Sequence, residues 1–188
     1  DLFIKNEINF KYFKGNILNE FQDVTKNDKT PFKVFTPFWR TAEKIYLDSP
    51  PSKNFTIKKK LQNKSFFKNC IVPNNILPKK NWHKKFEKYW NVSENDSKKI
   101  LKNLIANKIK DYGISRDIPS IEGTSKLSPY IKFGQIHVGT IWKRCNEIKS
   151  KSIGYRKYIN ELGWREFSHS LINYFPEFLN GNFRKDFD

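Results

Sequence analysis

The sequence predicts a mainly α-helical fold in which the second half of the chain forms a helical core. From residue 93 onward, apolar residues recur at intervals of three and four, the period of an amphipathic helix. Residues 48–91 carry four prolines and many lysines with little periodicity, which is typical of a connector. The chain of 188 residues is 37% hydrophobic and 16% aromatic, which is enough apolar material for a core.

The N-terminal part is predicted to contain extended pieces followed by one helix. Short apolar stretches are separated there by Lys, Asn, Asp and Gly, as in strands or extended segments bounded by turns. The next stretch, residues 38–47, is expected to be a helix that begins near Thr36 or Pro37. A long connector follows it over 48–91 and is expected to lie along a surface. The extended stretches are Leu2–Ile4, Ile17–Phe21 and Phe32–Phe38.

Helices are predicted for most of the second half. Ser93 and Asp96 have the spacing of a reciprocal cap, and the apolar pattern behind them runs to Tyr112, with Gly113 as a stop. Ser128 and Pro129 fit the cap and first position of a short helix that ends at Gly134. Two more helices are expected over 138–149 and 153–175. The last one is apolar nearly all round, so it should be buried between other helices.

Charge and composition restrict the class of protein. Lys and Arg number 36 against 19 acidic residues, and the formal charge of +17 favours a polyanionic partner. The alternative is that lysine fills surface positions without a purpose, as in proteins from AT-rich genomes. No apolar run approaches a membrane span, so a soluble intracellular protein is expected. The scattered cysteines and histidines predict reduced structural thiols and no metal site; they are Cys70, Cys145, His83, His137 and His169.

A polar and aromatic face is predicted on the last long helix. Glu161, Trp164, Arg165 and Ser168 fall within about a third of its circumference. Buried charge is costly unless it is paired, so this face should meet water, a ligand or a partner. One interpretation is an ordinary Glu161–Arg165 pair with a Trp packed beside it. The other is a wall that presents an aromatic platform and two polar groups to a planar ligand or a base.

The stretch GTSKLSPYIKFG at 123–134 places three hydroxyls ahead of a helix start. Thr124, Ser125 and Ser128 could satisfy turn amides and cap the helix. Hydroxyls and free amides at a helix start also suit a phosphate group. The stretch has neither the Gly-Lys-Ser/Thr of a Walker loop nor the closing glycine of a nucleophile elbow. Both the capping and the phosphate interpretation stay open on these residues alone.

Three blocks together resemble the DNA photolyase and cryptochrome family. Tyr112, Arg116-Asp117 and Pro119 with the 123–134 stretch are similar to the start of that family's flavin-binding part. INELGWREF at 159–167 resembles its following helix, and KVFTPFWR at 33–40 resembles the end of its light-harvesting α/β domain. The blocks occur in the family's order and cover most of the chain.

The resemblance implies a domain organisation. Residues 1–40 would be the C-terminal remnant of the α/β, Rossmann-like antenna domain, 41–91 the interdomain linker, and 92–188 the first part of the helical FAD-binding domain. The chain lacks Met and begins with Asp1, and we expect it to be a piece of a longer protein.

The resemblance also implies roles for individual residues. Glu161 would contact the damaged base pair, and Trp164 would pack against a flipped pyrimidine dimer, so both are assigned as catalytic. Arg116 and Arg165 would contact the DNA backbone. Lys126 stands where the family often has Arg. The residues assigned to FAD are Tyr112, Thr124, Ser125, Leu127, Ser128, Tyr158 and Arg165.

The activity that the resemblance implies is light-driven repair of pyrimidine dimers in DNA by electron transfer from reduced FAD. The parent enzyme would be a deoxyribodipyrimidine photolyase, a carbon–carbon lyase, and this chain alone would be inactive. A monomer in the cytoplasm, associated with the nucleoid through DNA, is expected, with a folate or deazaflavin antenna pigment in the parent. Two alternatives are a cryptochrome-like photoreceptor that binds FAD and a non-catalytic basic nucleic-acid-binding module. The sequence does not distinguish cyclobutane from (6-4) lesions.

Overall fold

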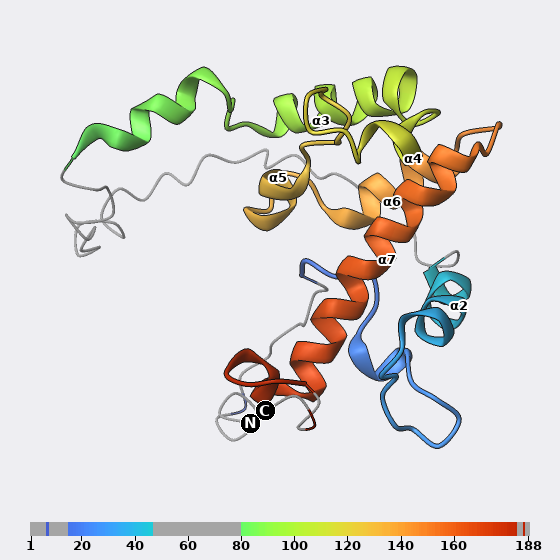
Figure 1. Cartoon of the computed structure of the whole chain (residues 1–188). Helices are drawn as coiled ribbons and strands as arrows, with labels where there is room; N and C mark the ends of the chain where they lie inside the picture. Colours follow the sequence, from blue (N-terminus) through green and yellow to red (C-terminus); the bar gives the residue numbers. More distant parts are fainter. Residues whose placement is uncertain (1–6, 8–14, 47–79, 184–185, 187–188) are drawn as a thin grey trace.

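A computed structural model of the chain describes residues 7, 15–46, 80–183 and 186 (Figure 1). Helices dominate this part of the protein, and no strand occurs among the described residues, which confirms the mainly α-helical prediction. In chain order the elements are η1 (Phe21–Asp23), α2 (Phe35–Tyr46), η3 (Asn81–Lys88), α3 (Glu94–Asn103), η4 (Leu104–Lys108), α4 (Tyr112–Ser115), α5 (Ser128–Lys132), α6 (Val138–Asn146), α7 (Ile153–Tyr174) and η5 (Pro176–Leu179).

Helix α7 is the element around which the others are arranged. It is 22 residues long and packs against α2, α4 and α6 (Figure 1). Its residues Tyr158, Ile159, Leu162 and Phe167 are all buried, although they point in different directions around the axis. The prediction of a long helix buried between others is therefore confirmed, and its bounds differ from the predicted 153–175 by one residue.

The beginning of α2 differs from the prediction. Phe32–Phe38 was expected to be extended, but the helix starts at Phe35. The side chains of Phe38, Trp39, Ala42 and Tyr46 are buried at helical spacing, and this packing decides the conformation. Pro37 does not interrupt the helix because it lies in the first turn, where backbone N–H groups have no intrahelical acceptor.

The other extended segments and the connector are only partly described. Residues 16–19 form bends that precede η1, not a strand, and Leu2–Ile4 lies outside the described residues. Most of the predicted connector, residues 47–79, lies outside them as well, whereas Asn81–Lys88 near its end is helical. The predicted boundary at residue 40 falls inside α2.

The cap at Ser93 is confirmed, but the helix behind it is not continuous. The Ser93 hydroxyl accepts a hydrogen bond from the Asp96 amide at 3.0 Å and donates one to the Asp96 carboxylate at 2.6 Å. Helix α3 then passes into the π-helical turn η4, and a new short helix, α4, begins at Tyr112. Gly113 is not the predicted stop, because it lies inside α4. A Cβ there would lie 3.7 Å from that of Lys157, so the glycine faces α7 at ordinary contact distance.

The predicted cap at Ser128 is wrong. Ser128 is the first residue of α5, and its side chain makes no capping hydrogen bond. Ser125 satisfies part of this turn instead, since its hydroxyl accepts from the Leu127 amide at 3.3 Å. The stop at Gly134 is confirmed, because this residue follows α5 with a φ of 71°, a conformation that favours glycine.

One hydrophobic core joins segments that are far apart in the sequence. It combines Leu18, Val24 and the buried face of α2 with residues from α3 to α7. Among the described residues, no helix is both long enough and apolar enough to span a lipid bilayer.

Candidate functional site

The contact between α4 and α7 brings four of the predicted site residues together. The rings of Tyr112 and Tyr158 meet edge to face, with centroids 5.0 Å apart, and both residues are buried. The Arg116 guanidinium lies 5.9 Å from the centre of the Tyr112 ring and forms an ion pair with Glu161. Burial raises the pKa of both Tyr112 and Tyr158, so both phenols stay neutral and able to donate.

The Arg116–Glu161 pair replaces the Glu161–Arg165 pair that was one interpretation of the sequence. Glu161 binds Arg116, the residue that follows α4, while Arg165 binds the neighbouring Glu166. About a third of each side chain in the Arg116–Glu161 pair remains exposed, 26% for Arg116 and 31% for Glu161. The pair therefore lies at the surface beside two buried tyrosines, where a ligand or a phosphate could reach it.

The loop before α5 lies against this tyrosine pair. The Ser125 hydroxyl lies near enough to the Tyr158 hydroxyl to lower the pKa of Tyr158, although burial has the larger and opposite effect. Lys126 has a left-handed backbone with a φ of 55°, and Leu127 after it is right-handed. Successive residues of these two conformations can form an anion-binding nest, although the Leu127 amide here donates to the Ser125 hydroxyl. Thr124 and Ser128 are exposed on either side of it.

The Lys126 side chain turns away from this nest. Its ammonium group forms an ion pair with Glu122, and both side chains are largely exposed, at 44% and 74%. The backbone of Lys126 shapes the loop, while its side chain lies at the surface. This arrangement explains how Lys can stand where the resembling family often has Arg.

Trp164 lies on another side of α7. Its side chain is exposed (47% for the residue), and its ring stacks on Phe35 with centroids 3.8 Å apart and an angle of 9° between the planes. Ser168, which was predicted to share its face, donates to the Trp164 carbonyl at 2.9 Å and closes the next turn. An exposed indole held flat in this way can receive a second aromatic ring.

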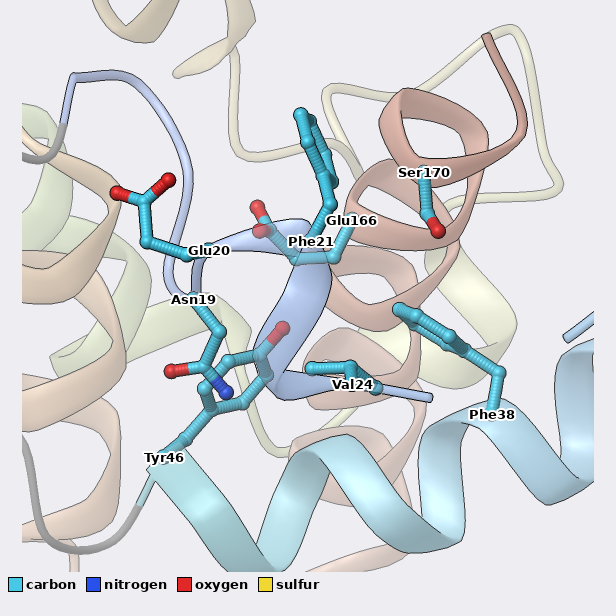
Figure 2. Close-up of a pocket in the computed structure, with 8 residues that line it drawn as sticks. All are labelled: Asn19, Glu20, Phe21, Val24, Phe38, Tyr46, Glu166 and Ser170. Atoms are coloured by element: carbon cyan, nitrogen blue, oxygen red, sulfur yellow. The ribbon is translucent and has the colours of Figure 1, made fainter. Parts of the chain in front are cut away.

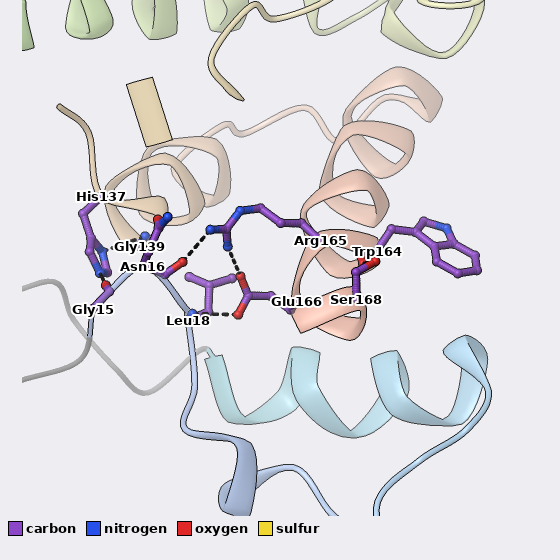
Figure 3. A network of polar contacts seen from close by, with 9 residues as sticks. All are labelled: Gly15, Asn16, Leu18, His137, Gly139, Trp164, Arg165, Glu166 and Ser168. Carbon is purple, nitrogen blue, oxygen red and sulfur yellow. Dashed lines mark hydrogen bonds and ion pairs between the residues drawn. The ribbon is translucent and has the colours of Figure 1, made fainter. Parts of the chain in front are cut away.

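Arg165 does not join the Glu161 and Trp164 side chains. Its guanidinium donates to the Glu166 carboxylate and to the Asn16 carbonyl, both at 2.6 Å. Figure 3 shows Trp164 directed away from this network, on the other side of α7. The structure thus places Arg165 against residues 16–18 of the N-terminal segment.

Glu166 is a buried residue that the sequence analysis did not select. It is only 3% exposed, and its carboxylate accepts from the Leu18 amide at 2.8 Å. Burial raises the pKa of Glu166 to about 7, although the bonds from Leu18 and Arg165 act in the opposite direction. A carboxylate on a helix that is apolar nearly all round was the signal that could have identified it.

A small cavity lies beside Glu166 (Figure 2). Its volume of about 10 Å³ is close to the minimum needed for one water molecule. The Asn19 side chain is buried there, and neither of its polar atoms has a hydrogen-bond partner in the described part of the chain. The cavity is too small for a cofactor. The residues that line it are Asn19, Glu20, Phe21, Val24, Phe38, Tyr46, Glu166 and Ser170.

Comparisons with known proteins show which family the chain is similar to. The family model for DNA photolyase matches residues 2–57. The deoxyribodipyrimidine photo-lyase of Agrobacterium fabrum is 30% identical over 94% of this chain and 37% of its own length. That of Alkalihalophilus pseudofirmus is 31% identical over 92% of this chain and 36% of its own length.

A solved structure agrees as well. The crystal structure of a bacterial class III photolyase from Agrobacterium tumefaciens superposes with a TM-score of 0.72 at 26% identity. It covers 100% of this chain and 39% of the crystallised one. The chain therefore spans little more than a third of the length of the relatives that it matches.

Proposed function

Since this chain belongs to the DNA photolyase family, we propose that it contributes one wall of a flavin site and one wall of a lesion site to the light-driven repair of pyrimidine dimers in DNA. The observation that carries the proposal is the packing of α4 on α7. It sets the Tyr112–Tyr158 pair, the loop with Ser125 and the exposed Arg116–Glu161 pair beside one another. In this proposal, residues 1–40, 41–91 and 92–188 belong to the antenna domain, the linker and the FAD-binding domain.

The residues around the loop suit the phosphate side of FAD. The Lys126–Leu127 pair has backbone conformations that suit an anion-binding nest, in which the Leu127 amide would have to exchange its bond to Ser125 for the anion, and the hydroxyls of Thr124 and Ser128 lie exposed beside it. Ser125 and the neutral phenols of Tyr112 and Tyr158 add donors that carry no charge of their own. When bound, reduced FAD supplies the electron that splits the dimer after it absorbs blue light. The protein residues bind and orient the cofactor and exclude water.

The exposed face of Trp164 suits a base that has left the duplex. A dimer cannot be reached inside stacked DNA, and an aromatic ring such as Trp164 compensates part of the lost stacking. Arg116 can contact a phosphate without reading sequence, as the repair of lesions in any sequence requires. The net charge of +17 favours binding to DNA in general.

A repair assay on the intact, flavin-loaded protein tests the proposal. Trp164→Ala is expected to lower the preference for dimer-containing over undamaged DNA by about 1–3 kcal/mol, because a stacking partner is lost. The flavin absorbance should stay unchanged, since Trp164 is not among the flavin residues. Ile172→Ala, which removes another exposed apolar side chain from α7, is the matched control and should leave the preference unchanged.

Two results would contradict the proposal. If blue light causes no loss of dimers with the wild-type protein, the repair function is wrong, and flavin binding without repair would favour a photoreceptor. If Trp164→Ala leaves the preference unchanged, the role of Trp164 is wrong. The 188-residue chain alone is expected to retain flavin poorly, which the absorbance spectrum of the purified chain measures directly.

A further inference from the structure

We propose that Phe35, at the first turn of α2, is a positioning residue that fixes the plane of Trp164 for a stacked base. The inference rests on the proposed function, because it assigns Phe35 a role in the lesion wall. Phe35 lies in the part of the chain that the sequence assigns to the antenna domain. Lesion recognition would therefore depend on two segments more than a hundred residues apart in the sequence.

The geometry of the stack is the first argument. Ring centroids 3.8 Å apart and an interplanar angle of 9° mean that the Phe35 ring covers one face of the Trp164 indole. Phe167 meets the edges of both rings, with centroids 6.0 Å from each. Because Trp164 remains 47% exposed, its uncovered surface is open to a further planar group. A base that stacked there would form a stack of three rings with Trp164 and Phe35.

The second argument is that Phe35 itself is held in place. Behind it lies Trp39, whose ring is nearly parallel at 12° with a centroid 6.3 Å away. Trp39 is buried, and its indole N–H donates to the Asn160 side chain at 3.1 Å. Gly163 allows this close packing, because a Cβ there would lie 2.6 Å from the Trp39 ring. Phe35 is therefore partly buried between the Trp164 ring and a fixed Trp39 ring.

Two roles are possible for Phe35: a plug, which occupies the base site until a base displaces it, or a wall, which supports the Trp164 ring permanently. The contacts above favour the wall. A plug would have to leave the indole before a base could bind, and its removal would strengthen binding. A wall restricts the rotamers of an exposed Trp before the base arrives, so that less conformational entropy is lost on binding. The two roles predict opposite signs for the same substitution.

The test measures the affinity ratio for dimer-containing over undamaged DNA with the intact, flavin-loaded protein. Phe35→Leu keeps an apolar side chain but removes the ring, and it should lower the ratio roughly two- to tenfold, the range expected for one aromatic pair. Phe35→Tyr keeps the ring and should restore the wild-type ratio. Phe38→Leu is the matched control: it truncates a buried ring of the same helix, and Phe38 packs on Phe32 and Phe167. It should lower stability without changing the ratio.

Trp164→Ala completes the experiment. If Phe35 acts through Trp164, Phe35→Leu should have no further effect on the ratio in the Trp164→Ala background. A ratio that falls in Trp164→Ala but not in Phe35→Leu overturns the role of Phe35 alone. A ratio that rises in Phe35→Leu shows a plug and overturns it too. A ratio unchanged in Trp164→Ala overturns the proposed role of Trp164 and the present inference with it.

Discussion

Replacing Gly154 by Ala tests whether the close approach of α7 to the turn before α4 holds the site together. Gly154 is buried in the first turn of α7. A Cβ at this position would lie 2.7 Å from the Lys110 carbonyl carbon, and closer still to the carbonyl oxygens of Ile109 and Lys110. Because these are backbone atoms, the clash can be relieved only if α7 moves away from the turn that leads into α4.

The expected magnitude is the difference between two effects. Ala is favoured over Gly inside a helix by about 1 kcal/mol. Overpacking of a tight contact costs about 1–3 kcal/mol, and a rigid backbone partner puts Gly154 at the upper end of this range. The substitution should therefore lower the free energy of unfolding by about 2 kcal/mol.

Urea unfolding followed by circular dichroism measures this change, and Gly113→Ala is the matched control. Gly113 lies across the same contact, but its Cβ would meet Lys157 at 3.7 Å, an ordinary distance. It should leave stability unchanged or raise it by up to about 1 kcal/mol. If Gly154→Ala changes stability by less than about 0.5 kcal/mol, the surface-substitution range, the packing argument is wrong. In the intact protein, Gly154→Ala should also lower flavin content, since Tyr112 directly follows the displaced turn.

Two further outcomes follow from buried titratable groups. Folding raises the pKa of Glu166 from 4.5 to about 7, so its stabilising contribution is complete below pH 4.5 and is lost as the pH rises through about 7. Glu166→Gln should remove a pH dependence on the order of 3 kcal/mol, and urea unfolding of both proteins at pH 4 and pH 8 measures the difference. Burial raises the pKa of the Cys145 thiol to about 12. In a Cys70→Ser protein, Cys145 should therefore not react with a thiol reagent at pH 8 until the protein is unfolded. Rapid reaction of the native protein would contradict the burial of Cys145.

Periodicity predicted the elements whose packing follows their own local pattern. The bounds of α7 were predicted nearly to the residue because apolar residues continue through it without a break, and in the structure Ser152 caps its start. The Ser93 cap was predicted for the same reason. The start of α2 at Phe35 lies close to the predicted start near Thr36 or Pro37, but the extended conformation expected for Phe32–Phe38 was wrong, because the burial of Phe38 and Trp39 favours a helix there.

Spacing on a helix predicted which residues could share a face, but not which partners they meet. Trp164 and Arg165 are separated by roughly 100° around α7, and this angle is enough to place them against different segments. Glu161 pairs with Arg116 at the C-terminal end of α4, and the spacing of residues on one helix could not have predicted this partner. Glu166 was missed because its partner is the backbone amide of Leu18, a contact across 148 positions that leaves no local pattern.

The arrangement of these partners explains why α7 can serve as the rigid part of the site. Tyr158 faces the flavin residues of α4 and the loop, and Trp164 faces Phe35 of α2. Trp164 lies six positions after Tyr158, which is about 9 Å along a helix axis. The helix fixes this distance, and the loops do not contribute to it. Glu166 lies in the same turn of α7 as Trp164 and accepts a hydrogen bond from the Leu18 amide. The N-terminal segment therefore contacts α7 close to the position of Trp164. A substitution that loosens α7 near Tyr158 should therefore disturb flavin content, and one that loosens it near Trp164 should disturb lesion preference, whereas a break between these two residues should disturb both.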